Sequence, residues 1–294
     1  MSPLQTILNF RDVGQTINSF VGMPILQSGR LYRCARPDHA SENDRQRLVQ
    51  EFGITSVIDL RTESEHIQQV EKRQARVGAA ESPPEVPFES MHLQFFKINF
   101  NGSAYSRALM KQLSWINVIK LVSYMAAGYR VQAIRVLGTN VMRERGLIGL
   151  GVDSTDACIK EVREVFDVLA EPANYPLMIH CTQGKDRTGL VVLMVLLLLH
   201  VSTAAIHHDY MLSGPELTTE RAERVQEIES IGLTAEFADC DEKLVVKMVE
   251  HIEQKYGSIE KYLEHAGVTA EMQERVKRNL LETVGTPAPG DLGV

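Results

Sequence analysis

The segment His180-Cys181-Thr182-Gln183-Gly184-Lys185-Asp186-Arg187-Thr188-Gly189 lies between two apolar runs and decides the expected fold. The preceding run, Leu177-Met178-Ile179, has the length of a strand, and the following run, Leu190 to Leu199, has the length of a helix. The segment is therefore predicted to be a loop that joins a strand to a helix. Such loops bind anions, because the first N–H groups of a helix lack partners within it and the helix dipole is positive there.

Two side chains of this loop indicate a reaction. Cys181 is a candidate nucleophile, because a thiol at a helix N-terminus beside cationic groups ionises more readily than a free thiol. Arg187, six residues later, presents a planar set of donors that matches two oxygens of a phosphate. The pair predicts phosphoryl transfer to sulfur and then hydrolysis of the thiophosphate, with the Thr188 hydroxyl donating to the sulfur in the second step. An ordinary buried cysteine at a strand end is the alternative interpretation.

The full motif resembles the phosphate-binding loop of the cysteine-dependent protein tyrosine phosphatase superfamily. Its version at residues 184–189 is similar to that of bacterial and fungal tyrosine phosphatases that also act on phosphoinositides, including secreted mycobacterial and listerial enzymes. Residues 9–14, 29–37, 59–61 and 256–263 resemble other parts of the same branch. The resemblance implies an α/β fold: a central, mostly parallel sheet flanked by helices, with a helical insertion and C-terminal helices. It implies no cofactor and no metal.

The loop supplies most of the expected site. Cys181 is expected to be the nucleophile and Arg187 to bind the phosphate, while His180 orients the cysteine. Backbone amides complete the anion site, and the substrate-binding residues are Thr182, Gln183, Gly184 and Lys185. In the superfamily's lipid phosphatases a lysine in this position engages further phosphates of an inositol ring. The resemblance therefore implies the same for Lys185, whereas a lysine that only favours the thiolate or stays solvated is the alternative.

The general acid is the least determined part of the site. The superfamily supplies it from an aspartate upstream of the cysteine, and Asp153 and Asp156 stand 28 and 25 residues before it, in no recognisable acid-loop motif. Members of the resembled branch can carry an aspartate after the strand that corresponds to Met91–Ile98. This sequence has Asn99-Phe100-Asn101 there. Asp186 remains, either as the acid or as a group that orients the neighbouring arginine, with Asp153 as the second candidate.

The remainder of the chain is expected to form one domain. Residues 1–284 are predicted to be a single phosphatase domain and residues 285–294 a disordered tail. Residues 103–150 form a helical insertion, which is a candidate lid or an extension of the core. A helix is predicted from Asp153 to Ala170.

Two further groups of side chains are considered for the site. Arg33, Arg36 and Arg61 follow or end predicted strands and are candidates to approach the phosphate. His207-His208-Asp209-Tyr210 suggests a metal site, but it is a lone cluster and phosphoryl transfer to sulfur needs no metal. No metal ligand is therefore assigned.

Composition limits the class of protein. The net charge of −7 argues against a general binder of nucleic acid or of acidic membranes. Four cysteines lie far apart, which predicts neither a zinc site nor disulfides and favours the cytoplasm. The N-terminus does not resemble a secretion signal, and the longest apolar run is too short for a transmembrane helix.

The expected activity is hydrolysis of phosphoric monoesters. The expected partners are a phosphotyrosine protein, with dual specificity possible, or a phosphoinositide, and the sequence leaves the oligomeric state open. One alternative is an arsenate reductase or sulfurtransferase, for which Cys34 would have to approach Cys181 in space. Another is a slow, phosphate-binding pseudophosphatase, which the absent upstream acid keeps open.

Overall fold

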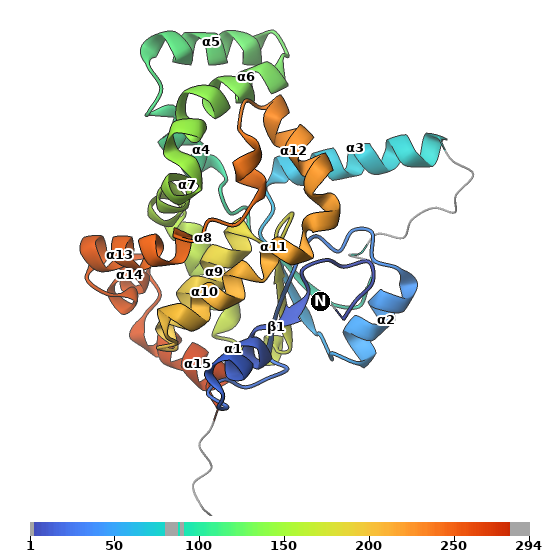
Figure 1. Ribbon diagram of the computed structural model, residues 1–294, viewed down its shortest axis with the longest axis vertical. Coiled ribbons are helices and arrows are strands. Elements are labelled where there is room, and N and C mark those ends of the chain that lie inside the picture. Colours follow the sequence, from blue (N-terminus) through green and yellow to red (C-terminus); the bar gives the residue numbers. More distant parts are fainter. Residues whose placement is uncertain (1–2, 80–87, 89–90, 283–294) are drawn as a thin grey trace, which may run out of the picture.

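A computed structural model describes residues 3–79, 88 and 91–282 and contains one central sheet (Figure 1). The strand order is β1-β2-β5-β3-β4, with β1 antiparallel to β2 and the other neighbours parallel. The strands are β1 (Arg11–Asp12), β2 (Leu31–Cys34), β3 (Ser56–Asp59), β4 (Gln94–Lys97) and β5 (Leu177–His180). The expected mostly parallel sheet is confirmed, and the predicted tail 285–294 lies outside the described residues.

Helices surround this sheet and also extend beyond it. They are α1 (Val13–Val21), α2 (Glu42–Gln50), α3 (Glu63–Ala79), α4 (Ser103–Met110), α5 (Trp115–Ala126), α6 (Arg130–Leu137), α7 (Arg143–Ala157), α8 (Ile159–Leu169), α9 (Asp186–Leu198), α10 (Thr203–Met211), α11 (Ser213–Glu216), α12 (Arg221–Ser230), α13 (Leu244–Tyr256), α14 (Ile259–His265) and α15 (Ala270–Leu280). Short turns of other helix types are η2 (Gly138–Met142), η3 (Pro172–Asn174), η4 (Thr218–Glu220) and η5 (Ala235–Ala238). None of the described helices is both long and apolar enough to cross a membrane.

The two faces of the sheet contact different layers because successive side chains of a strand point to opposite faces. Leu177 and Ile179 of β5 belong to the larger core, which includes α8, α9 and α13 to α15. Met178, between them, packs with α2 and the N-terminal segment in a second core. Helix α9 is buried almost all round, so its position at the centre of the larger core is firmly determined.

The insertion at residues 103–150 is helical, as expected, and α5 and α6 lie at the end of the molecule far from β1 and α15 (Figure 1). The predicted helix from Asp153 to Ala170 is wrong in its start. Helix α7 continues to Ala157, the chain breaks at Cys158, and α8 begins only at Ile159. Cys158 has a ψ of 36°, which interrupts the helical hydrogen bonds without a proline or glycine to mark the break.

Candidate active site

The carboxyl ends of three neighbouring strands meet at the catalytic loop. In the register of the sheet, His180 at the end of β5 pairs with Cys34 of β2 on one side and with Asp59 of β3 on the other. Cys181 therefore follows the central strand at the edge where parallel sheets bind their ligands. Its side chain is only 3% exposed. Helix α9 begins at Asp186, so the predicted strand, loop and helix are all present.

The body of the protein fixes the backbone of this loop. The carbonyl of Thr182 accepts from the Arg36 amide at 3.0 Å, and that of Gln183 accepts from Asn9 Nδ2 at 3.0 Å. The Gly184 carbonyl accepts from Arg33 Nη2 at 2.7 Å. Because the peptide is planar and trans, the N–H group that follows each carbonyl points the opposite way. The loop thus directs several amides away from the body, as an anion site requires.

Gly184 is the one loop position that no side chain can occupy. Its φ is +65°, and a Cβ there would lie 1.9 Å from the carbonyl oxygen of Cys34. The loop therefore packs directly on the end of β2. A glycine is required both by the positive φ and by the short distance to the Cys34 carbonyl.

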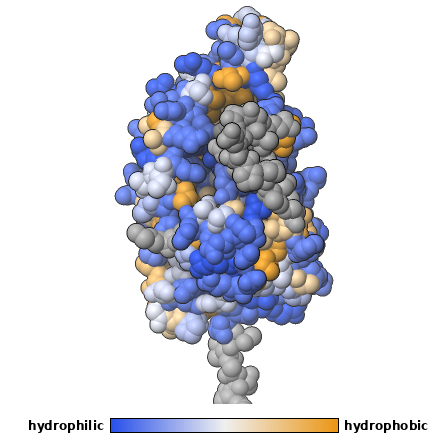
Figure 2. Space-filling view, turned by 90° about the vertical axis from the view of Figure 1, so that its right-hand side faces the viewer, coloured by the Kyte–Doolittle hydropathy of each residue, from blue (hydrophilic) through white to orange (hydrophobic). Residues whose placement is uncertain are grey.

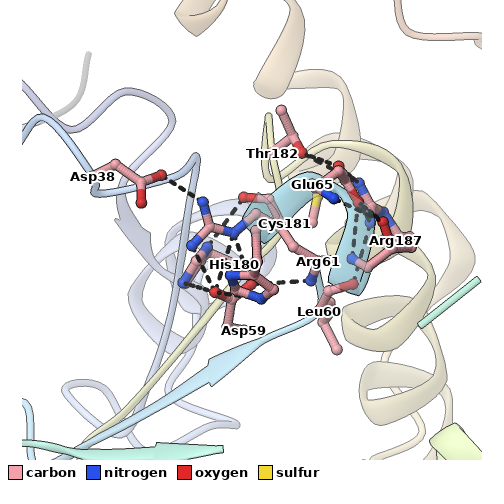
Figure 3. A network of polar contacts seen from close by, with 11 residues as sticks. Asp38, Asp59, Leu60, Arg61, Glu65, His180, Cys181, Thr182 and Arg187 are labelled. Atoms are coloured by element: carbon pink, nitrogen blue, oxygen red, sulfur yellow. Dashed lines mark hydrogen bonds and ion pairs between the residues drawn. The ribbon is translucent and has the colours of Figure 1, made fainter. Parts of the chain in front are cut away.

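Arg187 is held by a carboxylate that the sequence analysis did not identify. Its Nη1 and Nη2 each donate to one oxygen of Glu65 at 2.6 Å, and Nη1 also donates to the Leu60 carbonyl at 3.2 Å (Figure 3). Glu65 also accepts from the Thr62 amide and the Thr182 hydroxyl. Burial alone would raise the pKa of Glu65, but the bonds and charge of Arg187 outweigh this and hold it well below its ordinary range.

These contacts use one edge of the guanidinium. No described residue accepts a hydrogen bond from Arg187 Nε in the structure, whereas Nη2 has a second, longer contact of 3.3 Å to the Thr182 hydroxyl. The Glu65 pair thus fixes the plane of the guanidinium and leaves Nε for a phosphate oxygen. The sequence signal for Glu65 was an acidic residue in the first turn of a helix directly after a strand of the sheet.

His180 lies within a second buried network (Figure 3). Its Nδ1 is 3.1 Å from the Cys181 carbonyl oxygen, and its Nε2 is 3.7 Å from Asp59 Oδ2. Burial lowers the pKa of His180 in spite of the Asp59 charge, so the ring is neutral near neutral pH. Asp59 in turn accepts from Arg61 at 2.7 Å, and Arg61 also pairs with Asp38 at 2.5 Å. His180 therefore contacts the backbone of Cys181, and Arg61 binds the aspartate beside His180.

Arg33 supports the loop by its hydrogen bond to the Gly184 carbonyl. It is fully buried and pairs with Asp209 at 2.5 Å, which also binds Arg11 at 2.8 Å. Asp209 belongs to the cluster that suggested a metal, but its carboxylate is occupied by these two arginines. His208 stacks on Phe20 instead, with ring centroids 4.6 Å apart. The described residues contain no group of three potential metal ligands.

Lys185, expected to bind substrate, has its ammonium group engaged by other parts of the protein. The side chain is fully buried, and Nζ donates to the carbonyls of Asp239 at 2.6 Å and Phe237 at 3.3 Å. Nζ also lies 3.2 Å from Asp186 Oδ1. The lysine thus connects the loop to η5 and the residue after it.

The acid candidates differ in their surroundings. Asp153 is held by Arg145 at 2.8 Å, and Asp156 by His251 at 2.8 Å and Lys255 at 2.7 Å. Asp186 is 43% exposed in its side chain and lines a cavity together with Arg187. Thr188 is fully buried, and its hydroxyl has no hydrogen-bond partner among the described residues.

A cavity of about 580 Å³ adjoins the loop. Its floor includes Asp186 and Arg187, and most of its wall is apolar side chains from α4 to α7 and from the segment around α12. Arg130 and Arg224 are the two other arginines among its lining residues. Arg224 also lines a smaller cleft beside Thr182, together with Arg36 and Arg61. The geometry offers one thiol, a fixed guanidinium and a covered, mostly apolar pocket.

Comparisons with known proteins agree with this arrangement. A family model described as "Tyrosine phosphatase family" matches residues 2–282. The triple specificity protein phosphatase PtpB of Mycobacterium tuberculosis is 27% identical over 93% of this chain and 96% of its own length. A putative tyrosine-protein phosphatase of Cupriavidus necator is 27% identical over 71% of this chain and 61% of its own. A tyrosine-protein phosphatase of Nostoc commune is 35% identical over 21% of this chain and 24% of its own.

Proposed function

Because the chain belongs to the tyrosine phosphatase family, we propose that it hydrolyses phosphate monoesters, phosphotyrosine among them, through a cysteinyl-phosphate intermediate. The observation that supports this most is the position of Cys181 directly after β5, in the loop that leads into α9, near a guanidinium that Glu65 holds in one plane. Loop amides and Arg187 donate toward the anion site, and the dipole of α9 adds positive potential there. Three negative phosphate oxygens are stabilised best by such a set of fixed donors.

In the first step the Cys181 thiolate attacks phosphorus and the bond to the leaving oxygen breaks. Arg187 Nε and the loop amides bind the equatorial oxygens as their charge increases. Asp186 gives its proton to the leaving phenolic oxygen, so the tyrosine departs with its hydroxyl group restored. Both Asp186 and Asp153 have a cationic neighbour, but of the aspartates considered from the sequence Asp186 is the one that lines the cavity beside Arg187.

In the second step a water molecule attacks the phosphocysteine. The Asp186 carboxylate accepts a proton from this water, the sulfur–phosphorus bond breaks and inorganic phosphate leaves. The departing thiolate needs a hydrogen-bond donor, and the buried Thr188 hydroxyl has no other described partner. His180 acts through the Cys181 carbonyl, as a positioning residue.

The pocket accommodates more than one class of monoester. A volume of about 580 Å³ is within the range of small-molecule sites, and its apolar wall suits an aromatic ring. The name of the mycobacterial relative, a triple specificity phosphatase, supports a wider range than phosphotyrosine. For a phosphoinositide, the additional phosphates would meet Arg130 and Arg224, since Lys185 donates to backbone carbonyls.

The alternatives have less support. A resolving thiol for arsenate reduction would be Cys34, which is fully buried and whose pKa burial raises well above its ordinary value. A pseudophosphatase would not need a guanidinium fixed by two short ion-pair contacts next to a thiol. The proposed enzyme is a single domain over residues 1–284, works in a reducing compartment such as the cytoplasm, and uses residues 103–150 as a cover for its pocket.

The test is phosphate release from a phosphotyrosine peptide, a phosphothreonine peptide and a phosphoinositide panel. Cys181→Ser is expected to abolish turnover of every substrate. Cys158→Ser is the matched control, because that buried cysteine contacts Asn101 Oδ1 at 3.3 Å and serine retains the donor. Rapid acid quenching of wild type is expected to trap one phosphate per chain. Absence of release by the wild type from all substrates would refute the proposal.

A further inference from the structure

The helical insertion carries a charge opposite to that of the remaining chain. Its residues 103–143 contain six Lys and Arg and no Asp or Glu, which leaves 25 Lys and Arg against 38 Asp and Glu elsewhere, and its last seven residues add one of each sign, Glu144 and Arg145. The six cations are exposed: Arg107, Lys111, Lys120, Arg130, Arg135 and Arg143. Among the ion pairs between described residues, none includes any of the six. A net charge of −7 for the whole chain conceals this local excess.

The same segment exposes large apolar side chains. Trp115, Ile119 and Val122 of α5 are 73%, 56% and 57% exposed. They recur at a spacing of four and three residues and therefore form one stripe on the helix. Ile116 and Tyr129 beside them are also at least half exposed.

Helices α5 and α6, with residues 127–129 between them, are called the α5–α6 hairpin here. Its inner side contributes Leu121 and Ala133 to the pocket wall, and both are buried. Its outer side faces solvent at one end of the molecule (Figure 1). Pale to orange residues are visible at that end in the space-filling view (Figure 2). The apolar stripe is therefore a protruding surface and not part of a core.

The combination of side chains identifies the partner. Water-soluble chains rarely leave a tryptophan, isoleucines and valines grouped on one exposed helix, so such a patch marks an interaction site. Helices that lie in a membrane interface combine an apolar stripe with Lys and Arg and place Trp and Tyr at headgroup level. A segment with Lys and Arg but no Asp or Glu is attracted to an anionic lipid surface, because each cationic side chain near the surface strengthens binding.

We propose that the α5–α6 hairpin docks on anionic membranes by inserting its apolar stripe between lipid headgroups. The hairpin also forms part of the pocket wall, so docking brings the pocket to the lipid surface. The contact does not depend on catalysis. It can therefore be tested in Cys181→Ser protein and stands or falls separately from the proposed phosphatase activity.

Trp115 is the sole tryptophan of the chain and reports insertion directly. Its emission is expected to shift to shorter wavelength with vesicles of phosphatidylcholine containing phosphatidylglycerol, and not with phosphatidylcholine alone. Sedimentation with the same vesicles measures the partition coefficient. Raising the salt concentration is expected to weaken binding, because exposed charges are then screened.

Two pairs of variants separate charge from insertion. Lys120→Ala on α5 together with Lys111→Ala, four residues before the hairpin, is expected to lower partition about 25-fold, at about fivefold for each cation. The control Lys160→Ala with Lys247→Ala removes the same charge from α8 and α13 and is expected to change it little. Turnover of a soluble peptide is expected to stay unchanged in the Lys111/Lys120 variant, whose residues do not line the pocket.

Ile119→Ser with Val122→Ser is expected to abolish the shift and most of the binding. Val70→Ser with Val246→Ser, two exposed valines on α3 and α13, is the control. No partition of wild type to anionic vesicles at low salt would overturn the proposal. A dimer in ultracentrifugation that dissociates in the Ile119/Val122 variant would also overturn it and assign the stripe to a second copy of the chain.

Discussion

Glu65 provides the sharpest test of how the site is built. The substitution Glu65→Gln removes one charge and replaces an acceptor oxygen by an amide that donates. One of the two 2.6 Å contacts to Arg187 is then a donor facing a donor. Arg187 loses its fixed plane, and either the Thr182 hydroxyl or the Thr62 amide loses its acceptor, according to which oxygen the glutamine nitrogen replaces.

The magnitude follows from burial. Breaking a buried ion pair by removing one partner costs about 3 to 5 kcal/mol. Here the two side chains are 28% and 14% exposed, and glutamine keeps one acceptor. We therefore expect the free energy of unfolding to fall by about 2 kcal/mol, close to one charge-assisted hydrogen bond. A guanidinium displaced by about 1 Å is expected to lower kcat/KM about 100-fold.

The assay is kcat and KM for a phosphotyrosine peptide, together with urea unfolding. Glu63→Gln is the control, because Glu63 is exposed and lies in the same first turn of α3. Its stability and kcat/KM are expected to stay close to those of wild type. A lower KM and a higher kcat/KM in Glu65→Gln would refute the reasoning, because the carboxylate would then be competing with phosphate for Arg187.

Three further predictions concern the same loop. Arg187 holds the pKa of Glu65 below its ordinary value of about 4.3. The ion pair therefore stabilises the folded protein fully above that pH, and this stabilisation is lost as the pH falls below it. On acidification, the free energy of unfolding is expected to fall less for Glu65→Gln, which lacks the carboxylate, than for wild type. Gly184→Ala places a Cβ 1.9 Å from a carbonyl oxygen and is expected to abolish turnover with helix content retained. Gly22→Ala, at a similar φ with nothing within 4 Å, is its control and is expected to stay active. Asp186→Asn is expected to lower kcat more for phosphotyrosine than for p-nitrophenyl phosphate, whose leaving group needs less protonation; equal losses would contradict a role as acid.

The local parts of the fold and site were accessible from the sequence. The strand before Cys181 and the helix after it follow from two apolar runs, and a helix that is apolar on every side is expected to be buried. The N-cap of α2 at Ser41, whose side chain accepts from the Asp44 amide, is likewise a short-range effect. Each of these features depends on residues within one or two helical turns of each other.

Contacts between distant residues were not accessible in this way. Glu65 and Arg187 are 122 residues apart, and Arg33 and Asp209 are 176 apart. In the sequence Glu65 is one acid among several in a helix of mixed charge, and Asp209 is one member of a cluster that suggested a metal. Only the strand order, which places β3 beside β5, brings the start of α3 to the loop.

Lys185 shows what this means for specificity. From its neighbours in the loop it is a candidate to bind phosphate, yet its ammonium donates to two carbonyls more than fifty residues later in the chain and lies 3.2 Å from Asp186 Oδ1. In the function proposed above, recognition beyond the reacting phosphate is assigned to the pocket arginines, Arg130 of α6 and Arg224 of α12. Arg130 is also one of the exposed cations of the α5–α6 hairpin. On these proposals the chemistry belongs to the loop, whereas the choice of substrate and the choice of docking surface belong to helices that carry no catalytic motif.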